Sequence, residues 1–71
     1  MNPYETLANA IVKQAATDYI KALKQIKRFP NDKAARDEKN DLERFFRSDW
    51  YHTLTNVDSE YLIGRLQAVV V

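Results

Sequence analysis

The sequence predicts a small all-α domain, a helical bundle of three main helices plus one short helix, with a long N-terminal helix. Apolar residues recur every three or four positions from Tyr4 to Ile26, and again from Leu42 onward, as they do on the buried face of a helix. No segment alternates apolar and polar residues like a half-buried strand. The β-prone run at residues 69–71 is too short to form a sheet alone. We therefore expect helices and no sheet.

The chain has 71 residues, and we expect them to form one helical domain, residues 1–71, around a single core. Small domains often rely on disulfides, a metal ion or a partner subunit for stability. The sequence contains no cysteine and one histidine, which excludes disulfides and argues against a metal site or a bound cofactor. Tight packing or oligomerisation remains as the source of stability.

The first helix is expected to run from Pro3 to about Arg28. Asn2 is a favoured N-cap residue, proline suits the first helical position, and Pro30 prevents the helix from continuing. Its apolar stripe reaches the first turn and comprises Tyr4, Ala8, Ile11, Ala15, Tyr19, Ala22 and Ile26. Five basic residues project beside this stripe within an arc of roughly 120°. This basic edge consists of Lys13, Lys21, Lys24, Lys27 and Arg28.

Two helices are expected next. Asn31 or Asp32 caps the second helix, whose opening charged run at residues 33–43 is predicted to face water. Ser48 caps a short third helix at residues 49–54.

A last helix is expected to begin after the capping residue Asp58. We expect its buried face to contain Tyr61, Leu62, Leu66 and Val69 or Val70. Gly64 lies inside this helix, where glycine costs about 1 kcal/mol relative to alanine. Either another backbone approaches it closely or the helix is only marginally stable.

The residues that could perform chemistry are few. His52 is the only side chain with an ordinary pKa near neutrality, and Asp49 lies close enough in sequence to orient its ring. A lone histidine among aromatic residues is far more often structural than catalytic, and no phosphate-binding glycine loop or paired histidine motif is present. We therefore expect a protein that is not an enzyme.

The densest aromatic group lies in the middle of the chain. Leu42, Phe46, Trp50 and Leu54 would share one face if the second helix continued, so most of this group is expected in the core. The alternative is that Trp50 or Tyr51 remains at the surface beside Arg47 as a contact anchor, because these three residue types are enriched at binding hot spots.

Nucleic-acid binding ranks third among the functions considered. The net charge is only +1, although residues 1–29 carry five basic and two acidic side chains and the rest carries six basic and eight acidic ones. Residues 50–65 could be mistaken for a helix-turn-helix reader, but the second helix offers few long polar side chains. We therefore do not expect specific DNA binding, and only weak nucleic-acid binding remains as a third hypothesis.

The run FFRSDWYHTLTNVDSEYLI, residues 45–63, resembles small proteins encoded on phages and integrative elements of Gram-positive bacteria. With the preceding lysine-rich helix, the resemblance extends over most of the chain. It implies a mobile-element setting and little chemistry. Phage accessory proteins of this size often act on host machinery, including by inhibiting host-defence systems.

Two functional hypotheses follow. The first is a non-enzymatic accessory protein, cytoplasmic in its bacterial host, that docks on a host or phage protein. The second is a helical oligomer that sequesters an anionic nucleotide-type ligand. Both use the same candidate binding residues, which are Lys24, Lys27, Arg28, Arg47, Trp50, Tyr51 and His52.

A homo-oligomer, a dimer or higher, is expected in either case. The first helix would be about 39 Å long, whereas a compact chain of this length has a diameter of about 29 Å. Its uncovered apolar end is the expected contact between copies. The expected interface residues are Tyr4, Leu7, Ala8, Ile11 and Ala15.

Overall fold

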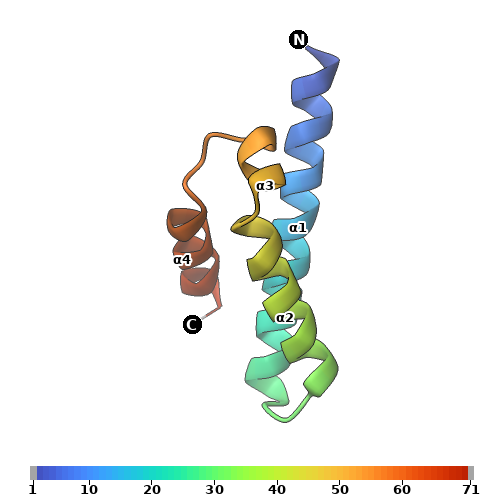
Figure 1. Cartoon of the computed structure of the whole chain (residues 1–71). Helices are drawn as coiled ribbons and strands as arrows, with labels where there is room; N and C mark the ends of the chain where they lie inside the picture. Colours follow the sequence, from blue (N-terminus) through green and yellow to red (C-terminus); the bar gives the residue numbers. More distant parts are fainter. Residues whose placement is uncertain (1, 71) are drawn as a thin grey trace.

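The computed structural model describes residues 2–70 and contains four helices, α1 (Pro3–Arg28), α2 (Lys33–Phe46), α3 (Asp49–Leu54) and α4 (Ser59–Val69). Helices α1 and α2 form a long antiparallel hairpin, with α3 beside the upper half of α1 (Figure 1). Helix α4 packs against α1 and α2. No strand occurs in this part of the chain. The all-α prediction, with three main helices and one short one, is confirmed.

Each helix begins at a side-chain cap that the sequence predicts. Asn2 accepts a hydrogen bond from the Tyr4 N–H at 2.9 Å, and Asp32 accepts one from the Ala35 N–H at 3.1 Å. The same contact occurs at the start of the last two helices, where Ser48 caps α3 and Asp58 caps α4. These caps satisfy backbone donors that the first turn of a helix leaves without partners. They explain why the helices begin where they do.

The core lies where the four helices meet and is built from aromatic rings. Tyr19 of α1, Phe46 of α2 and Tyr51 of α3 are fully buried. Phe46 lies edge-to-face with Tyr19, with ring centroids 5.6 Å apart, and with Tyr51 at 5.8 Å. Edge-to-face packing favours the quadrupoles of both rings, which adds to the hydrophobic stabilisation. The core therefore ties three helices together at one level of the hairpin.

Helix α4 buries Leu66 and half-buries Leu62, as expected, but Ile63 rather than Tyr61 completes its buried face. Ile63 and Leu66 pack into the core, whereas Tyr61 and Val69 are more than 60% exposed, so the expectation that Tyr61 belongs to the core is wrong. The buried positions 59, 63 and 66 follow helical spacing from the first residue of α4, and this register turns Tyr61 outward. A Cβ atom added at Gly64 would meet nothing within 4 Å, so no neighbouring backbone requires this glycine.

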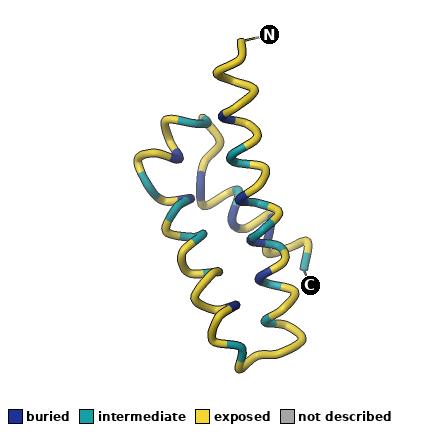
Figure 2. Tube along the Cα trace, turned by 90° about the vertical axis from the view of Figure 1, so that its right-hand side faces the viewer, coloured by how far each residue is buried: buried dark blue, intermediate teal, exposed yellow. Residues whose placement is uncertain are grey.

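The molecule is elongated, with extents of 42 × 20 × 19 Å. Its radius of gyration is 12.8 Å, against about 11 Å for a compact chain of this length. The cause is the length of α1, whose first residues extend beyond the other helices (Figure 1). We call residues 2–7 the overhang. Every residue of the overhang is exposed, and Ala8 is the first buried residue of the part of the chain that the structure describes (Figure 2). No helix within residues 2–70 is long and apolar enough to cross a membrane.

Candidate functional site

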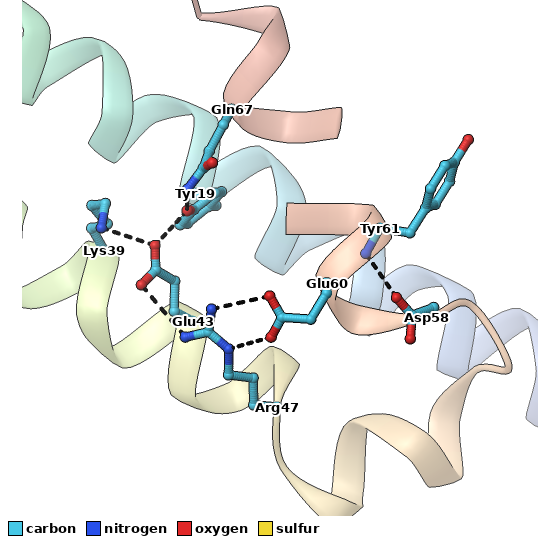
Figure 3. A network of polar contacts seen from close by, with 8 residues as sticks. All are labelled: Tyr19, Lys39, Glu43, Arg47, Asp58, Glu60, Tyr61 and Gln67. Atoms are coloured by element: carbon cyan, nitrogen blue, oxygen red, sulfur yellow. Dashed lines mark hydrogen bonds and ion pairs between the residues drawn. The ribbon is translucent and has the colours of Figure 1, made fainter. Parts of the chain in front are cut away.

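A group of polar side chains joins α1, α2 and α4 beside the aromatic core (Figure 3). The buried Tyr19 hydroxyl donates to Glu43 Oε2 at 2.5 Å and accepts a hydrogen bond from Gln67 Nε2 at 3.1 Å. Because the hydroxyl lies out of contact with water, leaving it without partners would cost free energy. Both of its partners are supplied, one by α2 and one by α4.

Glu43 is also the centre of a chain of ion pairs. Its carboxylate lies 2.9 Å from Lys39 Nζ and 3.8 Å from Arg47, and its side chain is only 15% exposed. Arg47 extends the chain to α4 by donating two hydrogen bonds to Glu60, at 2.7 and 3.3 Å. We call these six residues the polar junction, namely Tyr19, Lys39, Glu43, Arg47, Glu60 and Gln67.

The junction shifts the titration of its members. Burial, reinforced by the hydrogen bond to Glu43, raises the pKa of Tyr19 to about 12. For Glu43, burial acts to raise the pKa, but the hydrogen bonds from Tyr19 and Lys39, with the charge of Arg47, outweigh burial and hold the pKa below its usual value. All these contacts lie within the chain, so the junction ties α1, α2 and α4 together.

Trp50 and Tyr51 occupy opposite environments. Trp50 is 58% exposed, and its indole lies edge-to-face against the half-buried Phe45, 5.6 Å between centroids. Tyr51 is fully buried and donates a hydrogen bond from its hydroxyl to the Val57 carbonyl at 2.9 Å. The expectation that Tyr51 contacts a partner is therefore wrong. The chain leaves helical geometry at residues 47 and 48, so the face that Phe46 buries does not extend to Trp50.

Arg47 and His52 are both exposed, and neither faces a catalytic neighbour. The Arg47 guanidinium is already held by Glu60 and Glu43. The His52 ring lies edge-to-face with Tyr51, 5.4 Å between centroids, and no hydrogen bond joins it to Asp49 in the described chain. Residues 2–70 also contain no group of three or more metal-binding side chains. The expected orientation of His52 by Asp49 is not found.

The basic edge remains open to solvent. Lys24, Lys27 and Arg28 are exposed, and among the described residues none of them forms an ion pair. The Arg28 guanidinium lies over the Phe29 ring at 5.6 Å from its centroid. The nearby hollow that Lys21 lines also contains the carboxylates of Asp32 and Glu38, which would repel an anion. These three residues also lie on the lower half of α1, away from α3, which carries Trp50 (Figure 1).

An apolar groove runs between α1 and α2, with a volume of about 410 Å³. Its lining residues are Ala10, Ile11, Gln14, Ala15, Asp18, Leu42 and Phe45. The polar groups among them, Gln14 and Asp18, lie toward one end along α1, and Gln14 Nε2 donates to Asp18 Oδ1 at 3.0 Å. The rest of the groove is apolar surface that nothing in the chain covers.

A second, more polar cleft of about 620 Å³ separates the start of α1 from the loop between α3 and α4. Amides and hydroxyls of Asn9, Thr53, Thr55 and Asn56 contribute to its walls. All of these residues are at least partly exposed, so the cleft contains no buried polar group that awaits a ligand.

The residues expected at a subunit interface divide into two groups. Tyr4 is 80% exposed and Leu7 62% exposed, while Ile11 is half-buried along the groove. Ala8 is buried against the chain itself, beside the loop between α3 and α4, so the expectation that it contacts another copy is wrong. Ala15 packs in the core and is also largely buried, but it lines the groove between α1 and α2.

Sequence reasoning missed the polar junction, because residues 33–43 look like a solvated charged run. The available signal was the spacing of Lys39, Glu43 and Arg47 at four-residue intervals next to the buried Phe46.

Comparisons with family models, with curated proteins and with solved structures find no match to this chain.

Proposed function

We propose that the protein is a non-enzymatic interaction module that binds a host or phage protein through Trp50. The observation that carries this proposal is the exposure of the only tryptophan in the chain, which is 58% exposed although the core is built from aromatic rings. Tryptophan is among the residues most enriched at binding hot spots. A small domain that leaves this residue outside its core loses the free energy of folding that burying the indole would contribute.

The surroundings of Trp50 suit an anchor that enters a partner's pocket. Phe45 supports one side of the indole, and α3 begins at the Ser48 cap two residues before it. An indole held in this way loses little conformational freedom on binding, so less of the contact energy is spent on ordering it. Arg47 is held by Glu60 at the start of α4, so it would contribute only to the polar rim of an interface centred on Trp50.

The resemblance of residues 45–63 to small phage and mobile-element proteins supports the biological setting of this proposal. In that setting the protein is an accessory factor in the cytoplasm of the bacterial host. Its partner is a component of host machinery, such as a host-defence system that it inhibits. The proposal involves no catalysis and no cofactor.

The test compares the wild-type chain with Trp50→Ala and with Tyr61→Ala. Tyr61 is the matched control, because it is an exposed aromatic residue of similar size on α4. Each immobilised protein is incubated with host lysate, a retained protein is identified and purified, and its Kd is measured by calorimetry. Trp50→Ala should weaken binding by about 2 kcal/mol or more, whereas Tyr61→Ala should not. Equal Kd values for all three proteins would rule out Trp50 as the anchor.

A second candidate function is supported by the basic edge. We propose as the alternative that Lys24, Lys27 and Arg28 bind an anionic nucleotide-type ligand or, more weakly, a nucleic-acid backbone. The supporting observation is that these three cations have no carboxylate partner among the described residues. Calorimetry against nucleotides and single-stranded DNA at low salt, where such contacts are strongest, tests it. Equal affinity of wild type and the triple glutamate variant would exclude the basic edge.

A further inference from the structure

We propose that the apolar groove between α1 and α2 is filled by the overhang of a second copy of the chain, in an antiparallel two-fold dimer. This site is separate from Trp50 and goes beyond the proposed function. The groove lacks an apolar occupant, and the overhang lacks a cover for Tyr4 and Leu7. In a two-fold dimer the overhang of each copy fills the groove of the other, so both apolar surfaces of both copies are covered.

The exposed area of the chain matches this arrangement. The structure exposes 5274 Å², whereas a compact monomer of the same mass would expose about 4,600 Å². The excess, roughly 700 Å², approaches the roughly 800 Å² that each partner buries in a stable interface of standard size. A short peptide in the groove would leave the overhang exposed, whereas a second copy covers the groove and the overhang together.

The sequence of α1 fixes the register of the dimer. Positions 4, 7, 11, 14 and 18 alternate steps of three and four residues, the spacing of a coiled-coil seam. This seam adjoins the face that buries Ala8, Ala15, Tyr19 and Ala22. It is apolar at Tyr4, Leu7 and Ile11 and becomes polar at Gln14 and Asp18. The most apolar antiparallel pairing places Leu7 of one copy opposite Ile11 of the other, with the two-fold axis level with Asn9.

In this register the ring of Tyr4 reaches the polar end of the groove. Tyr4 lies opposite Gln14 of the second copy, and helical side chains lean toward the N-terminus of their own helix. In an antiparallel pair that direction points toward Asp18 of the second copy, one turn further along. Asp18 lines the groove, and Gln14 contacts only one of its carboxylate oxygens. The other oxygen is placed to accept a hydrogen bond from the Tyr4 hydroxyl.

Sedimentation equilibrium at micromolar concentration tests whether the dimer exists. The wild-type chain should sediment at twice 8.3 kDa. Leu7→Glu should raise the dimer Kd by at least about tenfold, because it places a charge in the apolar layer. Val69→Glu is the matched control, since Val69 is equally exposed but lies on α4. Circular dichroism checks that each variant keeps its helices. A wild-type monomer, or a dimer that Leu7→Glu leaves intact, would overturn the proposal.

Disulfide formation tests the register, because the chain contains no cysteine of its own. Leu7→Cys and Ile11→Cys variants are oxidised separately and as a mixture. The proposed pairing brings position 7 of one copy next to position 11 of the other, so the mixture should form the mixed disulfide faster than either variant alone. Two copies of position 7 are offset by about 6 Å along the axis. Preferential linkage of position 7 to position 7 would indicate a parallel pair or an antiparallel pair in another register, and either would contradict the proposed register.

Discussion

The two halves of α1 are both amphipathic, yet they differ in how their apolar residues are covered. The half around Tyr19 packs against α2, α3 and α4, and even its buried hydroxyl has two hydrogen-bond partners. The overhang carries Tyr4 and Leu7 with no cover from the chain itself. The difference shows that the apolar stripe of α1 is longer than one copy of the chain can bury. We therefore expect the stability of the fold to reside in the half around Tyr19, whereas the overhang is the surface that the proposed dimer uses.

The largest expected effect concerns the aromatic core. Phe46→Ala should lower the free energy of unfolding by about 3–5 kcal/mol, because it removes a buried ring and leaves a cavity. Small domains have total stabilities of only about 5–15 kcal/mol, so the variant should be largely unfolded. Chemical denaturation followed by circular dichroism measures the loss. A variant with an unchanged midpoint would show that the core does not depend on Phe46.

The polar junction should make stability depend on pH. The folded protein holds the pKa of Glu43 below its usual value, so its contribution is present above the unfolded pKa and is lost as pH falls through the folded pKa. Glu43→Gln should therefore cost about 1.5–3 kcal/mol at pH 7. The cost should be smaller at pH 3, because that pH lies below the unfolded pKa, where the contribution of Glu43 to stability declines. Denaturation curves at both pH values test this. An equal loss at both would assign the effect to packing.

At alkaline pH the dependence of stability on pH has the opposite sign, so stability falls as pH rises. The pKa of Tyr19 is raised to about 12, so the contribution of its protonated form is complete below pH 10 and is lost as pH rises toward 12.

Gly64 should give a smaller effect, and a favourable one. It lies on α4 next to the junction, and a Cβ atom there meets no neighbour. Gly64→Ala should therefore stabilise the protein by about 1 kcal/mol through helix propensity alone. Thermal denaturation should show a higher Tm. A lower Tm would mean that α4 approaches other parts of the molecule more closely than its open outer face indicates.

The overhang should give the smallest effect on the fold. Leu7→Ala should change the free energy of unfolding by less than about 0.5 kcal/mol when measured at concentrations too low for dimers, because surface substitutions rarely do more. Denaturation at nanomolar concentration, followed by tryptophan fluorescence, provides the measurement. A loss similar to that of Phe46→Ala would contradict the division of α1 into a stabilising half and an associating half.

Local chemistry made most of the fold predictable from the sequence. Asn2, Asp32, Ser48 and Asp58 are capping residues, and each helix begins directly after one of them. The second helix could be capped by Asn31 or Asp32 on sequence grounds, and the hydrogen bond from the Ala35 N–H identifies Asp32.

The environment of the candidate site was harder to predict, because it depends on how helices meet. The break at Arg47 and Ser48 resets the helical phase, so counting on from Phe46 placed Trp50 on the buried face, a position that Tyr51 takes in the structure. Likewise, Glu43 sits in a charged run, and only the packing of α1 and α4 brings Tyr19 and Gln67 to it.

The hydrogen bond from Gln67 to Tyr19 also has a consequence for the order of folding. It joins residues 48 positions apart, whereas the hairpin of α1 and α2 closes through the short turn at residues 29–32. Closing the longer loop costs more chain entropy, so the hairpin can form before α4 docks. Until then Tyr19 and Phe46 lack the packing of Ile63 and Leu66, and the Tyr19 hydroxyl lacks its hydrogen bond from Gln67. Native-state hydrogen exchange should therefore find α4 opening at a lower free energy than the hairpin, which gives the folded protein a partly open form in which its core is briefly accessible.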